Sequence, residues 1–197
     1  GITMPRASAD FARGMGELAR LAVATVGERL GDRLSDDDLA TLREAADLVE
    51  PWLAHEPDRF ALLHGDFRLD NLLIAPAGPQ VTVVDWQTLS VGLPARDLSY
   101  FLATSLQPAD RREHERDLVR TYHRRLQDLG VARYHADECW HDYRLGLLQV
   151  PMITALGFAF SAETDRGDDM ILTMFERGNQ ALRDHHTFEL VAEVAGV

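Results

Sequence analysis

Apolar residues recur at steps of three and four along most of this 197-residue chain. After an irregular lead-in over residues 1–9, this spacing predicts two amphipathic helices within residues 10–54. Gly31 ends the first helix, and the hydroxyl group of Ser35 can cap the start of the second. We expect these two helices to pack as scaffold beneath the middle of the chain.

Helical spacing returns in the second half of the chain. The predicted helices run over residues 96–105, from Pro108 to Gly130, over 139–160 with a kink at Pro151, over 171–182 and over 188–194. Residues 98–197 are therefore expected to be a helical subdomain. Because no repeat or long linker divides the chain, we expect residues 1–197 to form one domain.

The segment between these helical regions, residues 60–97, has a different pattern. A short apolar run, residues 60–63, leads into the segment, and strands are predicted at residues 72–75 and 81–84 with a turn at Ala77–Gly78. Residues 87–94 contain Ser, Gly and Pro without periodicity, and we predict a loop there. The expected fold class is α+β and mostly α-helical, with a short β-hairpin.

Polar residues stand where the predicted strands begin and end. His64, Asp66 and Asn71 have the H-x-D-x-x-x-x-N spacing of a kinase catalytic loop, in which the Asp receives a hydroxyl proton and the Asn holds magnesium. Asp85 follows the last strand, so its carboxylate can point back over this loop. Oxygen ligands from Asn71 and Asp85 would then converge on one hard cation.

These residues resemble the signature of the aminoglycoside phosphotransferase-like small-molecule kinases, which share the protein-kinase fold. The matching residues are His64, Gly65, Asp66 and Asn71, then Asp85 and Trp86, then Pro94, Ala95, Asp97 and Leu98. Gln87 departs from the pattern, because many members carry an acidic residue there. The resemblance implies an ATP- and magnesium-dependent kinase that phosphorylates a hydroxyl group of a small molecule.

The resemblance also implies roles for single residues. Asp66 would be the catalytic base, and Asn71 and Asp85 would hold magnesium against the ATP phosphates. Arg68 would steady the transferred phosphoryl group, although it could equally be a surface arginine paired with an acidic neighbour.

Two further residues would support the loop. His64 would bond to the loop backbone. Asp97 would accept hydrogen bonds from the loop, or else only favour the dipole of its own helix.

Aromatic residues of the helical subdomain have two possible uses. Trp140, Tyr143 and Phe160 recur near helical spacing and are expected mainly in the core. In the resembling family, helices of this subdomain also build the acceptor pocket, so these rings could line it instead.

The charge and composition narrow the choice of partners and compartment. A net charge of −12 argues against nucleic acid and anionic membranes. It would suit a cationic acceptor such as an aminoglycoside, although an acidic surface is more often only a solubility feature. Cys139 is the lone cysteine, so no internal disulfide can form. Because no signal-like start and no run of 18 apolar residues is present, we expect a cytoplasmic protein.

All 20 basic residues are arginine. A kinase of this fold uses a lysine and a Gly-rich loop of its N-terminal lobe to hold ATP, and neither is found before His64. We therefore expect a C-terminal lobe without the N-terminal ATP lobe. Such a chain would be an enzyme part that needs the missing lobe as its partner, or a non-catalytic module retained for binding or assembly. Its exposed lobe interface would promote self-association.

Overall fold

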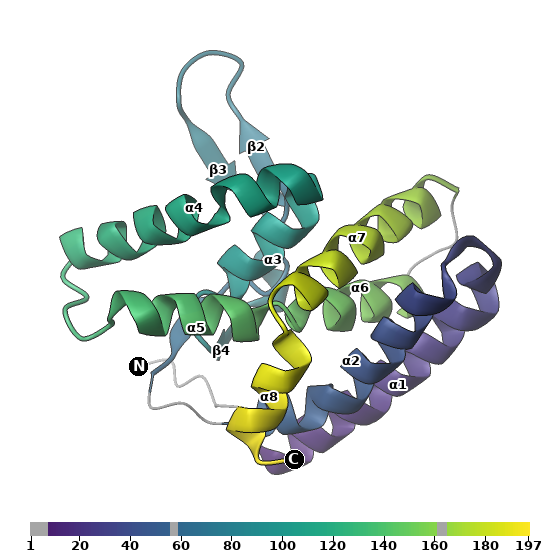
Figure 1. Ribbon diagram of the computed structural model, residues 1–197. Helices are drawn as coiled ribbons and strands as arrows, with labels where there is room; N and C mark the ends of the chain where they lie inside the picture. Colours follow the sequence, from purple (N-terminus) through teal and green to yellow (C-terminus); the bar gives the residue numbers. More distant parts are fainter. Residues whose placement is uncertain (1–7, 56–58, 161–164) are drawn as a thin grey trace.

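The computed structural model describes residues 8–55, 59–160 and 165–197, and this part of the chain is mostly helical (Figure 1). The helices are α1 (Ala9–Leu30), α2 (Asp36–Ala54), α3 (Arg96–Ser105), α4 (Pro108–Asp128), α5 (Ala136–Gly146), α6 (Gln149–Phe160), α7 (Asp165–Asp184) and α8 (Thr187–Ala195). The strands are β1 (Ala61–Leu63), β2 (Leu72–Ile74), β3 (Val81–Val83) and β4 (Ser90–Gly92). Short 3-10 turns, Gly31–Arg33, Leu69–Asn71 and Trp86–Thr88, connect some of them.

The first two helices confirm the predicted pair within residues 10–54. Ser8 caps α1 and Ser35 caps α2, each by accepting a hydrogen bond from a backbone N–H three residues later. Most of the predicted lead-in, residues 1–7, lies outside the described residues. The two helices lie side by side, and α1 also packs against α6 (Figure 1).

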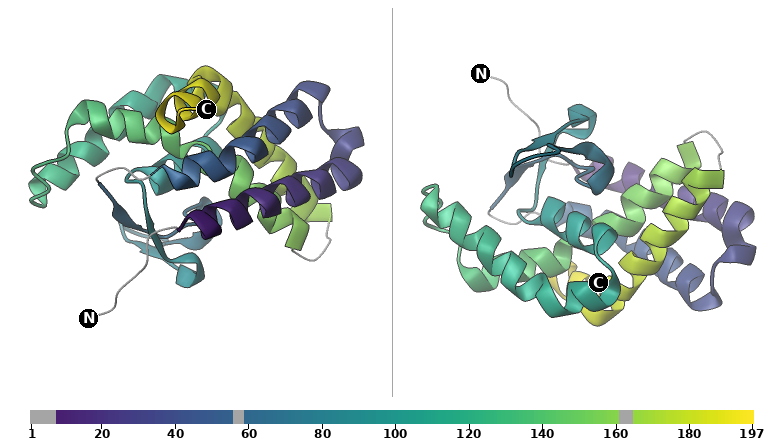
Figure 2. Two further views of the ribbon diagram at one scale, coloured as in Figure 1. Left: turned by 90° about the horizontal axis from the view of Figure 1, so that it is seen from below. Right: turned by 90° about the horizontal axis from the view of Figure 1, so that it is seen from above.

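One hydrophobic core joins helices from both halves of the chain. Val26 of α1, Leu42 of α2 and Phe175 of α7 are all 0% exposed and belong to it. The strands lie on one side of this helical assembly, next to α3 and the start of α1 (Figure 2). The helices therefore form a packed support for the loops at the strand ends.

Residues 136–160 form two helices, so the single kinked helix predicted over residues 139–160 is wrong. A turn at residues 147–148 interrupts the helix. Pro151 falls in the first turn of α6, where its missing N–H removes no helical hydrogen bond. By length and hydropathy alone, this stretch could cross a membrane, but 67% of an apolar 18-residue window within it is buried inside the fold. Its apolar composition is accounted for by its position in the core.

The strands form two antiparallel pairs, of which the sequence indicated one. β2 and β3 form the expected hairpin, with Leu72 opposite Val83. β1 instead pairs with β4, and Leu63 lies opposite Ser90. The prediction of a loop over residues 87–94 is therefore wrong for residues 90–92, because this short strand has no periodic pattern and forms through pairing with a distant segment.

A buried ionic network ties α4 to α5 and to the end of α7. The guanidinium group of Arg111 is 1% exposed, donates to Glu115 Oε2 at 2.6 Å and forms an ion pair with Asp184. His185 Nε2 lies 3.0 Å from Glu115 Oε2, and the Tyr143 hydroxyl donates to the same oxygen at 2.9 Å.

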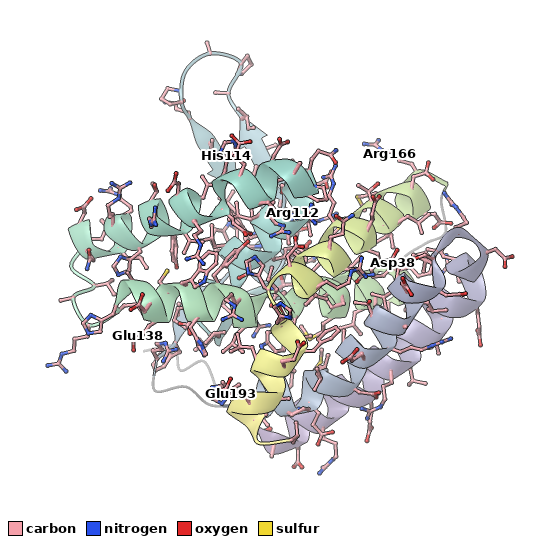
Figure 3. All side chains as sticks on the ribbon, in the orientation of Figure 1. Asp38, Arg112, His114, Glu138, Arg166 and Glu193 are labelled. Atoms are coloured by element: carbon pink, nitrogen blue, oxygen red, sulfur yellow. The ribbon has the colours of Figure 1, made fainter. Side chains whose placement is uncertain are left out.

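Similar polar contacts link other helices. Arg112, labelled in Figure 3, pairs with Asp184 at 2.7 Å on the outer side of the network. Asp38, at the start of α2, accepts hydrogen bonds from Asn179 at 3.1 Å and from Arg183 at 3.2 Å, both on α7 (Figure 3). These contacts fix the order in which the helices pack.

The network gives a prediction for the pH dependence of folding. Burial raises the pKa of Glu115, but the hydrogen bond and charge of His185, with Arg111 and Tyr143, outweigh burial and leave the pKa below its ordinary value. A lowered carboxyl pKa stabilises the fold above the ordinary value of 4.5 and loses this contribution as the pH falls. We expect the free energy of unfolding to decrease on acidification, measured by urea unfolding between about pH 7 and pH 3.

The variant Glu115→Gln tests the source of this dependence. At neutral pH it should lose about 2–3 kcal/mol of unfolding free energy and show a shallower acid dependence, because hydrogen bonds to a charged group are lost. Asp117→Asn is the control, since Asp117 pairs with Arg120 at 2.9 Å on the exposed surface of the same helix. Equal losses in the two variants would contradict the prediction.

Candidate active site

The predicted catalytic loop begins where β1 ends, and one carboxylate holds its first two residues. The backbone N–H of His64 donates to Asp97 Oδ2 at 2.6 Å, and that of Gly65 donates to Asp97 Oδ1 at 3.0 Å. Asp97 lies in the first turn of α3. Both carboxylate oxygens of Asp97 thus accept hydrogen bonds from the loop, as the resemblance implied. The role of this residue is not limited to a favourable interaction with the dipole of α3.

The carbonyl groups of the same two residues are bound by residues that sequence reasoning missed. Thr88 Oγ1 donates to the His64 carbonyl oxygen at 2.7 Å, and Gln149 Nε2 donates to the Gly65 carbonyl oxygen at 2.7 Å. These donors lie 24 and 84 residues away along the chain. No local motif could have indicated them, because only the fold brings them to the loop.

The His64 ring is buried and both of its nitrogens are bonded. Nε2 lies 2.9 Å from the carbonyl oxygen of Val84, so this nitrogen carries the hydrogen. Nδ1 accepts a hydrogen bond from the backbone N–H of Asp66 at 3.3 Å, which makes the ring the neutral tautomer. The ring connects the loop to the end of β3, and its geometry supports a structural role.

Gly65 is required by its backbone conformation and by its surroundings. Its φ is +88°, a region that residues with a side chain rarely adopt. A Cβ atom at this position would also lie 2.6 Å from the carbonyl oxygen of Thr88. The chain can therefore pass under Thr88 only because this residue is glycine.

Asp66 and Asn71, which are separated by four residues in the motif, are in direct contact. Asn71 Nδ2 donates to the backbone carbonyl oxygen of Asp66 at 2.7 Å and lies 3.1 Å from its Oδ2 atom. Asn71 is 6% exposed, and no donor in the described part of the chain bonds to its Oδ1 atom. Since the amide hydrogens face Asp66, the amide oxygen remains as a possible metal ligand.

A backbone hydrogen bond brings the segment of Asp85 next to Asn71. The N–H of Val84, the residue before Asp85, donates to the Asn71 carbonyl oxygen at 3.0 Å. Asp85 has φ 64° and ψ 58°, a left-handed conformation that aspartate tolerates better than most residues. Its side chain is exposed and makes no ion pair with the described residues.

The described part of the chain, residues 8–55, 59–160 and 165–197, contains no group of three or more His, Cys, Asp and Glu residues that could hold a metal ion by itself. Two protein oxygens are nevertheless enough for magnesium, because its other ligands are commonly phosphate oxygens and water. The Asn71 amide oxygen and the Asp85 carboxylate are hard donors of the kind that this ion prefers.

Arg68 contacts both acidic residues of the loop. Its Nε atom lies 3.3 Å from Asp66 Oδ2, and its Nη1 atom lies 3.3 Å from Asp70 Oδ2. The arginine side chain is 23% exposed, so it is neither a free surface residue nor fully buried. Arg68 therefore pairs with an acidic neighbour, Asp70, as expected for a surface arginine. It also contacts Asp66, the candidate base.

Tyr100 of α3 is a second neighbour of Asp66 that the sequence did not indicate. The residue is 1% exposed, and burial raises the pKa of its phenol. The charge of Asp66 raises this pKa further, whereas the nearby Arg68 lowers it. The phenol therefore remains protonated beside the carboxylate over the whole physiological range.

Trp140, Tyr143 and Phe160, which the sequence suggested as core residues or pocket walls, differ in their burial. Tyr143 is 0% exposed in the core, and Trp140 stacks on it with ring centroids 5.2 Å apart. Phe160, at the end of α6, is 72% exposed. Packing against the core therefore accounts for the first two rings.

The fold and this loop together define a class of protein. A mostly helical fold with small antiparallel sheets, in which the His64–Asn71 loop is held between β1 and β2, is consistent with the C-terminal lobe of kinase-like phosphotransferases. Residues 10–133 match the ecdysteroid kinase-like family, and the chain belongs to this family. It is a kinase-like phosphotransferase family related to the aminoglycoside phosphotransferases, so the resemblance identified a related family.

Curated relatives match shorter stretches. Acyl-CoA dehydrogenase family member 11 of Gallus gallus is 35% identical over 91 residues, which are 46% of this chain and 12% of that protein. The Homo sapiens member 11 is 32% identical over 65 residues, 32% of this chain and 8% of that protein. Acyl-CoA dehydrogenase family member 10 of Mus musculus is 45% identical over 53 residues, 25% of this chain and 5% of that protein.

The chain thus spans at most 12% of the length of these curated relatives. No solved structure matches the chain.

The conformation of Gly65 leads to a prediction with an internal control. Gly65→Ala should destabilise the fold more than Gly78→Ala, because both glycines have positive φ but only the first has atoms in the path of a Cβ. The strain shared by both variants is about 1 kcal/mol. The overlap with Thr88 should add about 1–3 kcal/mol at Gly65.

Chemical unfolding of the two purified variants measures this difference. Equal unfolding free energies for Gly65→Ala and Gly78→Ala would show that the close approach of Thr88 is not a constraint on the loop.

Proposed function

We propose that this chain carries the catalytic base and the metal ligands of an ATP- and magnesium-dependent phosphotransferase that acts on a small-molecule hydroxyl group. The observation that carries the proposal is the contact between Asp66 and Asn71 on a loop whose backbone is bound from three directions. A catalytic group must be held in one geometry to be effective, and this loop is built to hold one.

Asp66 would receive the proton of the acceptor hydroxyl as the hydroxyl oxygen attacks the γ-phosphorus of ATP, the bond from the γ-phosphorus to the bridging oxygen breaks and ADP leaves. Asn71 orients this carboxylate through its Nδ2 atom, 3.1 Å from Oδ2. The phenol of Tyr100 lies close by and does not compete for the proton, because with a raised pKa it already carries its own. Arg68 carries positive charge beside the same carboxylate and could extend toward the transferred phosphoryl group.

Asn71 and Asp85 would hold magnesium through the amide oxygen of one and the exposed carboxylate of the other. When bound there with ATP, magnesium would neutralise phosphate charge that otherwise repels an incoming oxygen nucleophile. A cytoplasmic setting, where ATP and magnesium are abundant, is part of this proposal.

The nucleotide-holding part of the enzyme would lie outside residues 1–197. The chain contains no lysine, which this reaction uses on the ATP phosphates. Large apolar side chains near the loop are exposed, including Leu62 at 60%, Leu73 at 59%, Ile74 at 66% and Trp86 at 51%. We propose that this surface contacts the nucleotide-holding part, and that without it the surface promotes self-association.

The acceptor would bind in the pocket between the loop and α7. This pocket has a volume of about 270 Å³ and includes Leu69, Met170, Met174, Arg68 and Arg177 in its lining. Its two methionines can adapt to an apolar part of the acceptor. Its two arginines do not favour a strongly cationic compound such as an aminoglycoside, although the net charge of the chain does.

The alternative, a non-catalytic module retained for binding or assembly, is less well supported. Such a module would have no need for a buried asparagine bonded to the loop carboxylate or for a left-handed aspartate at the end of β3. The left-handed backbone of Asp85 costs some stability, and a catalytic role of the loop would account for its presence.

The catalytic assignment predicts different effects for two neighbouring aspartates. In an active enzyme that includes the nucleotide-holding part, Asp66→Asn should lower kcat by about 10²–10⁴-fold, the usual contribution of a general base. Asp70→Asn is the matched control, because each carboxylate lies 3.3 Å from Arg68 but only Asp66 contacts Asn71.

Steady-state kinetics with a panel of hydroxyl compounds would measure both variants. Asp70→Asn should retain kcat, and any effect should be on KM, because Asp70 lies at the pocket. Full activity of Asp66→Asn would remove Asp66 as the base.

The absence of lysine leads to a prediction about nucleotide binding. The 197-residue chain alone should bind magnesium-ATP weakly, with a dissociation constant near or above about 1 mM. Isothermal titration calorimetry measures it, with ATP in excess magnesium as the ligand. Micromolar binding would contradict the proposal that the phosphate-holding groups lie elsewhere.

A further inference from the structure

Gln149 joins the catalytic loop to the helical core. It is the first residue of α6, directly after the break at residues 147–148, and its side chain is 0% exposed. Its Nε2 atom donates to the Gly65 carbonyl oxygen at 2.7 Å, and its Oε1 atom accepts from Arg96 Nε at 2.6 Å. Both ends of one buried amide are therefore used.

Arg96 fixes the direction of this amide. A guanidinium group can only donate hydrogen bonds, so the Gln149 oxygen must face Arg96 and the amide hydrogens must face Gly65. The guanidinium group lies 4.4 Å above the ring of Trp52 on α2. Burial lowers the pKa of Arg96 to about 10, which leaves it charged at neutral pH.

The bond from Gln149 acts on the peptide that precedes Asp66. The carbonyl of Gly65 and the N–H of Asp66 belong to the same planar peptide group. On the nitrogen side this group has only the 3.3 Å contact with His64 Nδ1, which is at the long end for a hydrogen bond. The 2.7 Å bond from Gln149 is therefore the shorter of the two contacts that set the plane of this peptide.

We propose that Gln149 is a positioning residue for phosphoryl transfer, which sets the orientation of the Gly65–Asp66 peptide and hence of the Asp66 carboxylate. Arg96, held by Trp52, sets the orientation of Gln149. This inference rests on the proposed function, in which Asp66 is the base. It adds a path of contacts from α2 through α3 and α6 to the reacting group.

Gln149→Glu separates this role from a purely structural one. The variant has nearly the same shape and keeps an oxygen facing Arg96. It loses only the donor to Gly65 and places an oxygen against that carbonyl group. We expect the amide hydrogen of Asp66 to exchange with solvent at least about fivefold faster, the change that one lost hydrogen bond produces. In the active enzyme we expect kcat to fall about tenfold, with KM for ATP nearly unchanged.

His123→Leu is the control for loss of a buried hydrogen bond elsewhere. His123 Nε2 lies 2.7 Å from the carbonyl oxygen of Tyr134, and the side chain is 7% exposed. This variant should lower the global unfolding free energy, while exchange at Asp66 should change only as much as global stability does. Hydrogen exchange by NMR on the 197-residue chain measures both variants without any need for catalysis.

Two results would overturn the proposal. The first is unchanged exchange at Asp66 in Gln149→Glu after correction for global stability. The second is faster exchange with kcat unchanged. A wild-type enzyme without phosphoryl transfer to any hydroxyl compound would instead remove the proposed function and with it the catalytic role of Gln149. The exchange data would still decide whether Gln149 orders the Gly65–Asp66 peptide.

Discussion

The structure around the candidate site depends on one constraint, that the polar backbone groups of His64 and Gly65 must be hydrogen-bonded after the strand has ended. The β1–β4 ladder stops at Leu63, so side chains provide the partners instead. Asp97 binds both N–H groups, and Thr88 and Gln149 bind the two carbonyl groups. The loop keeps its shape only while α3, the turn after β3 and α6 keep their positions.

The helical core supplies these positions. α3 carries Asp97 at its start, and it packs against α5, α6 and α7. The buried network around Arg111 joins α4 and α5 to the end of α7, and Trp52 of α2 supports Arg96 beside Gln149. Removing one partner of such a network is costly, because the remaining charge is left buried without its partner. The positions of α3 and α6 in the core therefore fix the backbone of the loop next to Asp66.

Membership of the ecdysteroid kinase-like family supports a kinase-like phosphotransferase in general terms. The curated relatives are many times longer than the matched stretches, so their names describe larger proteins. The pocket beside α7 differs from the aromatic pocket considered from the sequence, because Trp140 and Tyr143 are packed in the core. If the proposed function is correct, acceptor choice would depend on Met170, Met174 and Arg177 of α7 and on Arg68 of the loop.

The sequence by itself determined most of the helices, the β2–β3 hairpin and the motif spacing of Asp66, Asn71 and Asp85, because each depends on local periodicity or on neighbours within one short segment. Only the tertiary structure decided the pairing of β4 with β1, the break before Gln149 and the contact of Arg68 with both Asp66 and Asp70. It alone brought Thr88 and Gln149 to the loop. The physical reason is the same in each case: a buried polar group takes whichever partner the packed core places within reach, and that partner can lie anywhere along the chain.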